Sequence, residues 1–163
     1  GFTPAEGLIM STRCGDIDPA ALSYILNREG FTPGDLDDFI NKKSGVLGLS
    51  GKYSDFLKIE TGYLENDPDC VRAFECYCYR IKKYIGAYAA VMNGVDAIIF
   101  GGGVGENSPI IRETILSDMG YLGIKLDKNL NDDRSIKEGI ISSKNSETTV
   151  GDPVSPLYDT IKY

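Results

Sequence analysis

The stretch DAIIFGGGVGENSP, residues 96–109, joins a short apolar run to a glycine-rich segment and a helix start. Residues 96–100 predict a fully buried strand of the kind found in parallel sheets. Four glycines occupy positions within 101–105, and a helix is expected from about Ser108 to Met119, because a serine followed by proline is a strong helix start. Alternation of helix, strand, loop and helix along the chain predicts an α/β layer fold.

The glycine segment fits neither of two common phosphate-binding motifs. A P-loop requires a lysine that is missing here, and the dinucleotide fingerprint requires a third glycine where Glu106 stands. Glycines permit positive φ and remove the Cβ atom, so a flat group can lie on the backbone. The segment also follows a strand, where α/β sheets bind ligands, and Asn107 adds a donor and an acceptor. A tight strand-to-helix turn is the alternative explanation, but four glycines are more than a turn requires, which favours ligand contact.

Composition excludes several classes of function. The chain has 163 residues, 42% hydrophobic and 25% charged, with a net charge of -7, so the basic footprint of a nucleic-acid surface is missing. No apolar run approaches the ~20 residues of a membrane span. The absence of histidine excludes Ser-His and Cys-His nucleophiles within this chain. The four cysteines form no CxxC, which together with the lack of histidine argues against zinc. Cys76 and Cys78 are interpreted as packing residues in a reducing cytoplasm rather than as a redox pair.

Two helices are predicted near the start of the chain. Asp18 followed by proline begins the first, which stops at Gly30. Thr32 and Pro33 begin the second, which ends near Gly45, so the pair predicts an αα-hairpin.

The remaining elements alternate between helix and strand. Residues 46–60 are predicted to form a glycine-and-serine loop that leads into a short helix. Apolar residues at three- and four-residue spacings predict a helix over 69–92, with this stripe in the core. Residues 121–127 predict a short strand, residues 129–139 a polar loop, and weaker strands are expected near 140 and 149.

Several stretches resemble one protein family, in the same order. FGGGVGENS resembles the adenosine-contacting loop of acetate kinases, which usually have Thr-Ala in place of Gly101-Gly102. The match runs from residue 1 to about residue 146. The other matching stretches are GFTPAEGLIMSTRCGDIDPA, NKKSGVLGLSG, YRIKKYIGAYAAVMNG and GYLGIKLD.

The resemblance implies a ribonuclease H-like fold of the actin, hexokinase and Hsp70 type. Such enzymes interconvert ATP plus acetate with ADP plus acetyl phosphate, using magnesium. The chain is expected to be a single domain over 1–163, a fragment of the C-terminal nucleotide-binding domain, and its first residue, Gly1, is consistent with a fragment. Acetate and acetyl phosphate would bind only with the missing N-terminal domain. The resemblance also implies a cytoplasmic homodimer, and we expect the interface along 69–92.

The resemblance assigns roles to particular residues. Arg13 in MSTRCGD matches the active-site arginine, a planar cation suited to a phosphoryl group or a carboxylate. Without the resemblance, the favoured interpretation of Arg13 would be a surface or cap pairing with Asp16. Asp55 and Phe56 match the nucleotide pocket, although Leu57 stands where the family usually has arginine. The adenosine-side residues are Gly101, Gly102, Gly103, Val104, Gly105 and Asn107.

The tail, 147–163, diverges from the family pattern. In place of an acidic run that helps hold magnesium, its last residues, PVSPLYDTIKY, offer Asp159, so we expect the magnesium site to be incomplete in this chain and assign no metal ligand. Three interpretations stay open: a nucleotide-binding part that is inactive alone, a non-catalytic remnant that serves as an interaction domain, and a relative that uses propionate, butyrate or pyrophosphate.

Overall fold

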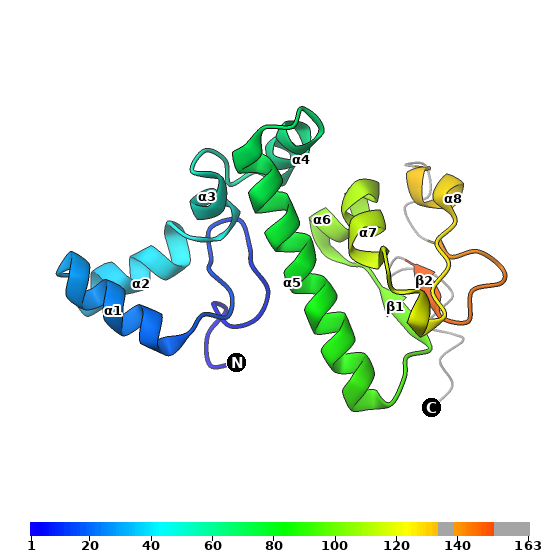
Figure 1. The fold of residues 1–163 in the computed structure, drawn as a ribbon, viewed down its shortest axis with the longest axis horizontal. Helices are drawn as coiled ribbons and strands as arrows, with labels where there is room; N and C mark the ends of the chain where they lie inside the picture. Colours follow the sequence, from blue (N-terminus) through cyan, green and yellow to red (C-terminus); the bar gives the residue numbers. More distant parts are fainter. Residues whose placement is uncertain (134–138, 152–163) are drawn as a thin grey trace. The chain divides into compact units, whose positions relative to one another are not determined.

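The computed structural model describes residues 1–133 and 139–151. The chain forms two compact units, Gly1–Ile81 and Lys82–Tyr163, and each is described here by itself. Figure 1 shows the elements of both units. Most of the predicted tail, including Asp159, lies outside the described residues.

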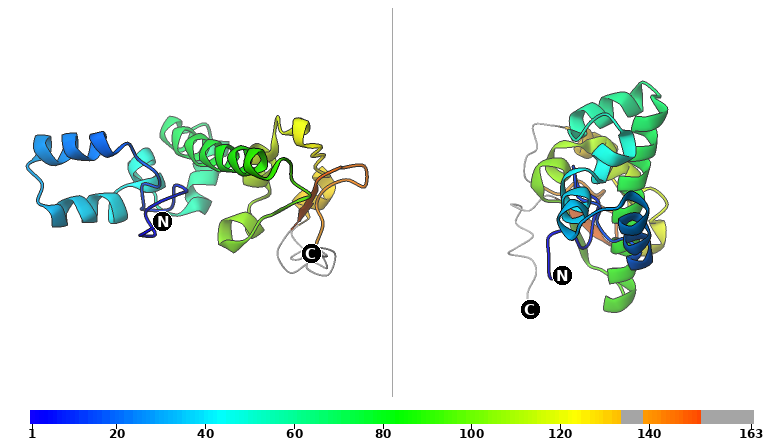
Figure 2. Two further views of the ribbon diagram at one scale, coloured as in Figure 1. Left: turned by 90° about the horizontal axis from the view of Figure 1, so that it is seen from below. Right: turned by 90° about the vertical axis from the view of Figure 1, so that its left-hand side faces the viewer.

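The first unit begins with a helical hairpin, α1 (Pro19–Glu29) and α2 (Pro33–Lys42), whose helices run side by side (Figure 2). The Asp18 carboxylate accepts a hydrogen bond from the Ala20 amide, and Gly30 ends α1 in the left-handed conformation with φ 65°. Thr32 and Asp35 form a reciprocal capping box at the start of α2. The predicted hairpin is therefore confirmed, with both starts at the expected residues.

Two shorter helices follow, α3 (Gly45–Ser50) and α4 (Phe56–Leu64). The prediction of a loop from residue 46 is wrong for α3. Its first amides are satisfied from outside the helix, since Val46 N donates to Met10 O at 2.9 Å and Leu47 N donates to Ser11 O at 3.0 Å. These tertiary hydrogen bonds stabilise a glycine-rich helix that its own sequence does not favour.

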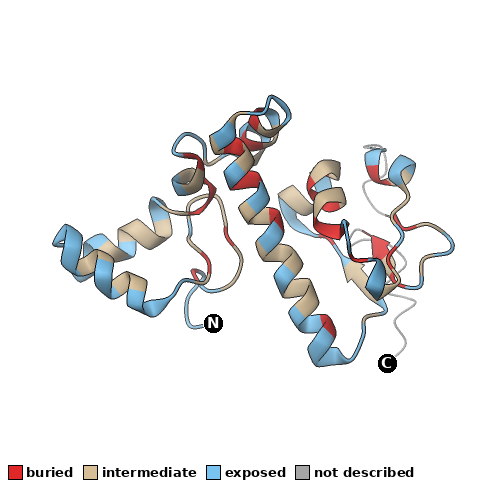
Figure 3. Ribbon diagram, in the orientation of Figure 1, coloured by how far each residue is buried: buried red, intermediate tan, exposed pale blue. Residues whose placement is uncertain are grey.

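The long helix α5 (Pro68–Met92) confirms the prediction over 69–92 and contributes residues to both units. In the first unit, Phe74 is buried and its ring stacks on Tyr63 at 3.9 Å between centroids. Close packing of α4 on α5 requires Gly62, where a Cβ atom would lie 2.4 Å from the Cys70 sulfur. Only part of the predicted apolar stripe lies in the core. Three of its last residues are exposed, namely Tyr88, Val91 and Met92. Figure 3 shows the exposure of this end of α5.

The second unit continues with β1 (Ala97–Ile99), α6 (Gly102–Asn107), α7 (Pro109–Leu116), the 3₁₀ turn η1 (Gly120–Leu122), α8 (Lys128–Asp132) and β2 (Thr149–Gly151). The strands β1 and β2 are parallel, with Ile98 opposite Val150. The strand predictions at 96–100 and near 149 are thus confirmed. The predicted full burial of β1 is wrong, because Ile99 is 38% exposed.

Two local predictions in this unit are also wrong. Residues 121–127 form the end of η1 and an isolated bridge from Leu126 to Ser142 rather than a strand. The predicted polar loop at 129–139 overlaps α8, which Asp127 caps by accepting from the Asn129 and Leu130 amides.

The core of the second unit lies between the helices and the two strands. Its buried apolar side chains are Phe100, Ile111, Ile115, Leu116, Met119, Ile124, Ile141 and Val150. β1 therefore positions the glycine segment that follows it at the end of a small parallel sheet. Within the described ranges, no helix combines the length and apolar character needed to cross a membrane.

Candidate nucleotide and phosphoryl-transfer site

In the first unit, Arg13 lies on a loop over residues 7–16 that is fastened to the junction of α2 and α3. Cys14 N donates to Ile40 O at 3.0 Å, and Ser44 N donates to Thr12 O at 3.0 Å. Within the loop, Met10 N donates to Arg13 O at 3.1 Å. These hydrogen bonds fix the backbone on both sides of Arg13. Arg13 itself is exposed.

Gly45, at the start of α3, lies against this loop. Its φ is +65°, and a Cβ atom would lie 2.2 Å from Met10 O and 2.9 Å from both Arg13 N and Arg13 O. Only glycine fits this space and this conformation together. The sequence places Gly45 at the end of the second predicted helix, but its role is to admit the Arg13 loop.

The alternative partner of Arg13, Asp16, is engaged elsewhere. Its carboxylate accepts from Gly7 N at 2.7 Å and lies 3.6 Å from the guanidinium of Arg80 on α5. Next to Arg13, burial raises the pKa of the Cys14 thiol above its ordinary value. The loop that carries Arg13 is thus held to α5 by the ion pair between Asp16 and Arg80.

Asp55 and Phe56 lie at the start of α4. Asp55 is the N-cap, and its carboxylate accepts from Leu57 N at 2.9 Å. The Phe56 ring packs against Tyr77 of α5 at 4.4 Å between centroids, inclined by 56°. Leu57, at the position where arginine is usual, is 67% exposed. Both predicted residues have local structural roles, and the Asp55 carboxylate remains at an exposed position.

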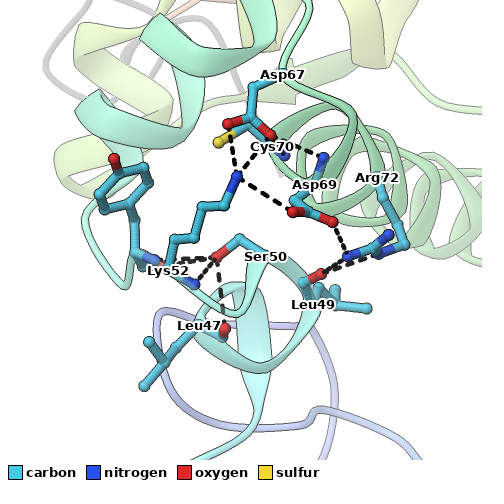
Figure 4. Close-up of polar contacts among 9 residues, drawn as sticks. Leu47, Leu49, Ser50, Lys52, Asp67, Asp69, Cys70 and Arg72 are labelled. Carbon is cyan, nitrogen blue, oxygen red and sulfur yellow. Dashed lines mark hydrogen bonds and ion pairs between the residues drawn. The ribbon is translucent and has the colours of Figure 1, made fainter.

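An ion-pair cluster links the α3–α4 connection to the start of α5 (Figure 4). Lys52 Nζ lies 2.8 Å from Asp67 Oδ2 and 3.1 Å from Asp69 Oδ2. Arg72 pairs with Asp69 at 2.7 Å and donates to Leu49 O through Nε and Nη2 at 2.9 and 2.7 Å. Figure 4 shows Lys52 and Arg72 approaching Asp69 from either side.

The cluster shifts the titration of its members. Hydrogen bonds to Asp67 and Asp69 raise the pKa of Lys52. The hydrogen bond from Lys52 in turn lowers the pKa of Asp67. Hydrogen bonds from Arg72, and then from Lys52, lower the pKa of Asp69. Sequence reasoning missed this cluster, because only the Asp69–Arg72 spacing is local.

A cavity of about 530 Å³ also lies in the first unit. It is mostly apolar, and none of the predicted site residues lines it. The lining residues come from the Arg13 loop, the α2–α3 region and α5, among them Ile9, Cys14, Phe39, Gly48, Cys76 and Arg80.

In the second unit, the glycine segment is a helix rather than the bare loop that its composition suggests. Gly101 is extended at the N-cap, Gly102 has φ +76°, and α6 begins there. Gly102 N donates to Glu106 Oε1 at 2.8 Å, and Asn107 Nδ2 donates to Gly103 O at 2.8 Å. These side-chain hydrogen bonds compensate for the low helix propensity of glycine.

The outer face of α6 is open. Among the described residues, a Cβ atom at Gly102 or Gly103 would meet no neighbour within 4 Å, whereas one at Gly105 would touch Phe100 at 3.4 Å. Gly105 therefore serves close packing, as a tight turn would require. Gly102 and Gly103 have no packing role, so the structure leaves a bare backbone surface at the carboxyl end of β1 on which a flat ligand can lie.

Arg112 is a residue of this region that sequence reasoning missed. It lies on α7, is 4% exposed, and donates through Nη1 to Gly105 O at 2.8 Å and Glu106 O at 2.9 Å. Its Nε donates to Asn131 Oδ1 at 2.9 Å, and Nη2 donates to Asn131 O at 2.7 Å. No periodicity distinguishes it, although an arginine on the apolar helix IIRETIL is a weak signal of burial.

The predicted residues thus fall into two groups. Arg13, Asp55 and Phe56 belong to the first unit, and the glycine segment with Val104 and Asn107 belongs to the second. Within residues 1–133 and 139–151, no group of three or more acidic or cysteine side chains could hold a metal ion.

Comparisons with known proteins identify the family. The acetokinase family model matches residues 1–152. The acetate kinase of Thermotoga maritima is 55% identical over 152 residues, which cover 92% of this chain and 38% of that protein. The acetate kinase of Heliobacterium modesticaldum is 54% identical over 134 residues, covering 82% of this chain and 34% of that protein. The chain therefore spans little more than a third of the length of these relatives.

Solved structures agree. The crystal structure of Porphyromonas gingivalis acetate kinase matches with a TM-score of 0.90 and 46% identity, covering 95% of this chain and 39% of that one. A propionate kinase from Francisella tularensis matches with a TM-score of 0.85 and 34% identity over the same shares. The predicted fold, a partial α/β domain of the actin, hexokinase and Hsp70 type, is confirmed. With the family model over 152 residues and these structural matches, the chain belongs to the acetokinase family.

Proposed function

We propose that this chain is the adenosine-binding part of an acetate kinase, which transfers a phosphoryl group reversibly from ATP to acetate. In that reaction the bond from the γ-phosphorus to ADP breaks as a bond to an acetate oxygen forms. The observation that carries the proposal is the open glycine face of α6 in a chain of this family. Two glycines there have no packing role, which is what an adenosine group lying on the backbone requires.

Each site residue has a role in this proposal. The adenosine would lie along Gly101, Gly102, Gly103, Val104 and Gly105, with Asn107 shaping the surface through its hydrogen bond to Gly103 O. Asp55 would accept hydrogen bonds from ribose hydroxyls, and Phe56 would fix that turn of α4 by packing on Tyr77. Because phosphoryl transfer depends on positioning and charge stabilisation, the exposed Arg13 would bind the transferring group.

The isolated chain is proposed to be inactive. It corresponds to a fragment of one C-terminal domain, and acetate and acetyl phosphate would bind only with the rest of the enzyme. ATP and ADP are used by kinases with magnesium, but the described residues offer no cluster of acids for that ion. We propose no magnesium ligand among the described residues. A cytoplasmic location is proposed from the same family membership.

Calorimetric titration with MgADP tests the nucleotide site. Gly103→Ala adds a methyl group where nothing lies within 4 Å, so it should leave the fold intact and stabilise α6 by roughly 0.5–1 kcal/mol. The same methyl group should obstruct the ligand face and weaken MgADP binding about tenfold. Gly34→Ala on α2 is the matched control, since its nearest neighbour would be Thr32 Oγ1 at 3.8 Å.

Saturable binding in the natural chain and in Gly34→Ala, with weaker binding by Gly103→Ala, would support the proposal. Equal affinity in all three would contradict the site. An absence of binding by the natural chain would favour the alternative of a non-catalytic remnant, whereas binding of pyrophosphate in place of MgADP would favour a pyrophosphate-using relative. Propionate and butyrate remain alternative acyl substrates, and the first is the substrate class in the name of one structural neighbour.

A homodimer is proposed through α5. Tyr88, Val91 and Met92 expose 59%, 84% and 61% of their surface along its last turns, and an apolar patch of this kind is typical of an interaction surface. Sedimentation equilibrium at micromolar concentration should give twice the mass of the chain, and Val91→Glu should reduce it to the mass of one chain. A single-chain mass for the natural sequence would contradict the proposal.

A further inference from the structure

The carboxyl end of α6 is held by one buried guanidinium. Gly105 O and Glu106 O are among the last carbonyls of this helix, which lack partners within it. Arg112 Nη1 donates to both, at 2.8 and 2.9 Å. Arg112 also donates to Asn131 of α8, through Nε to Oδ1 and through Nη2 to the backbone oxygen. Asn131 is completely buried, and its Nδ2 donates to Pro109 O at 3.0 Å.

Among the described residues, the other side-chain hydrogen bonds of the glycine segment are internal to it. Those from Gly102 N to Glu106 and from Asn107 to Gly103 O join residues within 101–107. They shape α6 but do not attach it to the rest of the unit. Gly102 and Gly103 have no side chain to pack its open end, and no neighbour from residues 1–133 or 139–151 lies at their Cβ positions. Arg112 therefore connects the segment to α7 and α8.

We infer that Arg112 is a positioning residue for the nucleotide: it holds the glycine face of α6 in its binding shape by fastening the Gly105 and Glu106 carbonyls to Asn131. This inference rests on the proposed function for the identity of the ligand. Arg112 acts through the backbone of α6, since its own side chain is 4% exposed. A preorganised face avoids the entropy cost of ordering four glycines when the ligand binds.

The test variant is Arg112→Lys, which keeps the charge but cannot reach two carbonyls and Asn131 at once. Its dissociation constant for MgADP should rise about tenfold. Arg72→Lys is the matched control, because that guanidinium also donates to a backbone carbonyl, Leu49 O, but in the first unit. MgADP affinity should be unchanged in the control. If Arg112→Lys does not fold, Asn131→Ala replaces it, removing one acceptor of Arg112 while both carbonyl contacts of Nη1 remain.

Amide hydrogen exchange separates positioning from general stability and needs no nucleotide. Ser108 N donates to Val104 O in α6, and Ile141 N donates to Val150 O in the core of the same unit. The inference predicts faster exchange at Ser108 with unchanged exchange at Ile141. Equal acceleration at both amides, or unchanged MgADP affinity in a folded variant, would overturn it. If the natural chain binds no MgADP, the proposed function fails, and the exchange ratio alone decides whether Arg112 positions α6.

Discussion

At the scale of single residues, the most specific feature of the first unit is the contact between Gly45 and the Arg13 loop. Three backbone atoms of that loop lie within 2.9 Å of the position that a Cβ atom would take. The position of this loop, and of the exposed Arg13 that it carries, therefore depends on Gly45 having no side chain. Sequence reasoning identified Arg13 through family resemblance and Gly45 only as a helix end.

This contact predicts a large effect of one methyl group. Gly45→Ala should destabilise the fold by about 3 kcal/mol, since it adds overlap with the loop to the strain of positive φ. Gly51→Ala is a matched control, because Gly51 has the same φ of +65° but no atom within 4 Å, and it should cost only about 1 kcal/mol. Urea denaturation measures both values. Equal destabilisation by the two variants would show that the loop does not press on Gly45.

At the scale of elements, helix ends were predictable and glycine-rich helices were not. Asp18, Gly30 and Thr32 act through hydrogen bonds within a few residues, so sequence alone located α1 and α2. The glycine-rich helices α3 and α6 have low helix propensity. They are stabilised by hydrogen bonds from residues distant in sequence or from side chains. Val46 and Leu47 of α3 donate to the loop at residues 10–11, and Arg112 donates to two carbonyls of α6. Such contacts leave no periodic signal in the sequence.

The ion-pair cluster that joins the α3–α4 connection to α5 makes stability depend on pH on the acid side. The pKa values of Asp67 and Asp69 are lowered from 3.8, so their pairing with Lys52 contributes stability above 3.8 and loses it as pH falls through the folded values. Lys52→Met should therefore be less stable than the natural chain at about pH 7, and the difference in free energy of unfolding should shrink as pH falls below 3.8 through the folded pKa values.

Chemical denaturation across this pH range measures the convergence. Lys58→Met is the control, because the Lys58 ammonium lies 5.6 Å from the Tyr53 ring centroid, and an aromatic ring does not titrate in acid. The effect of Lys58→Met on the free energy of unfolding should not change over this pH range. A stability difference for Lys52→Met that persists at low pH would exclude the two carboxylates as the partners that matter.

At the scale of the whole molecule, family and fold were predictable because they are carried by several long motifs in order along the chain. The division of site residues between two compact units was not, since it depends on packing rather than on motifs. The chain covers 38% of the length of the Thermotoga maritima relative. A site for nucleotide on this part, with acyl-group binding on the rest, accounts for the open face of α6 without requiring activity of the chain alone.

The most direct measurement of this account is an NMR titration of the ¹⁵N-glycine-labelled chain with MgADP. The account predicts saturable shifts of the Gly101, Gly102, Gly103 and Gly105 amides, while Gly30 and Gly34 on the α1–α2 hairpin do not change. Saturable shifts confined to glycines of the first unit, or no shifts at millimolar MgADP, would contradict the assignment of α6 as the adenosine site.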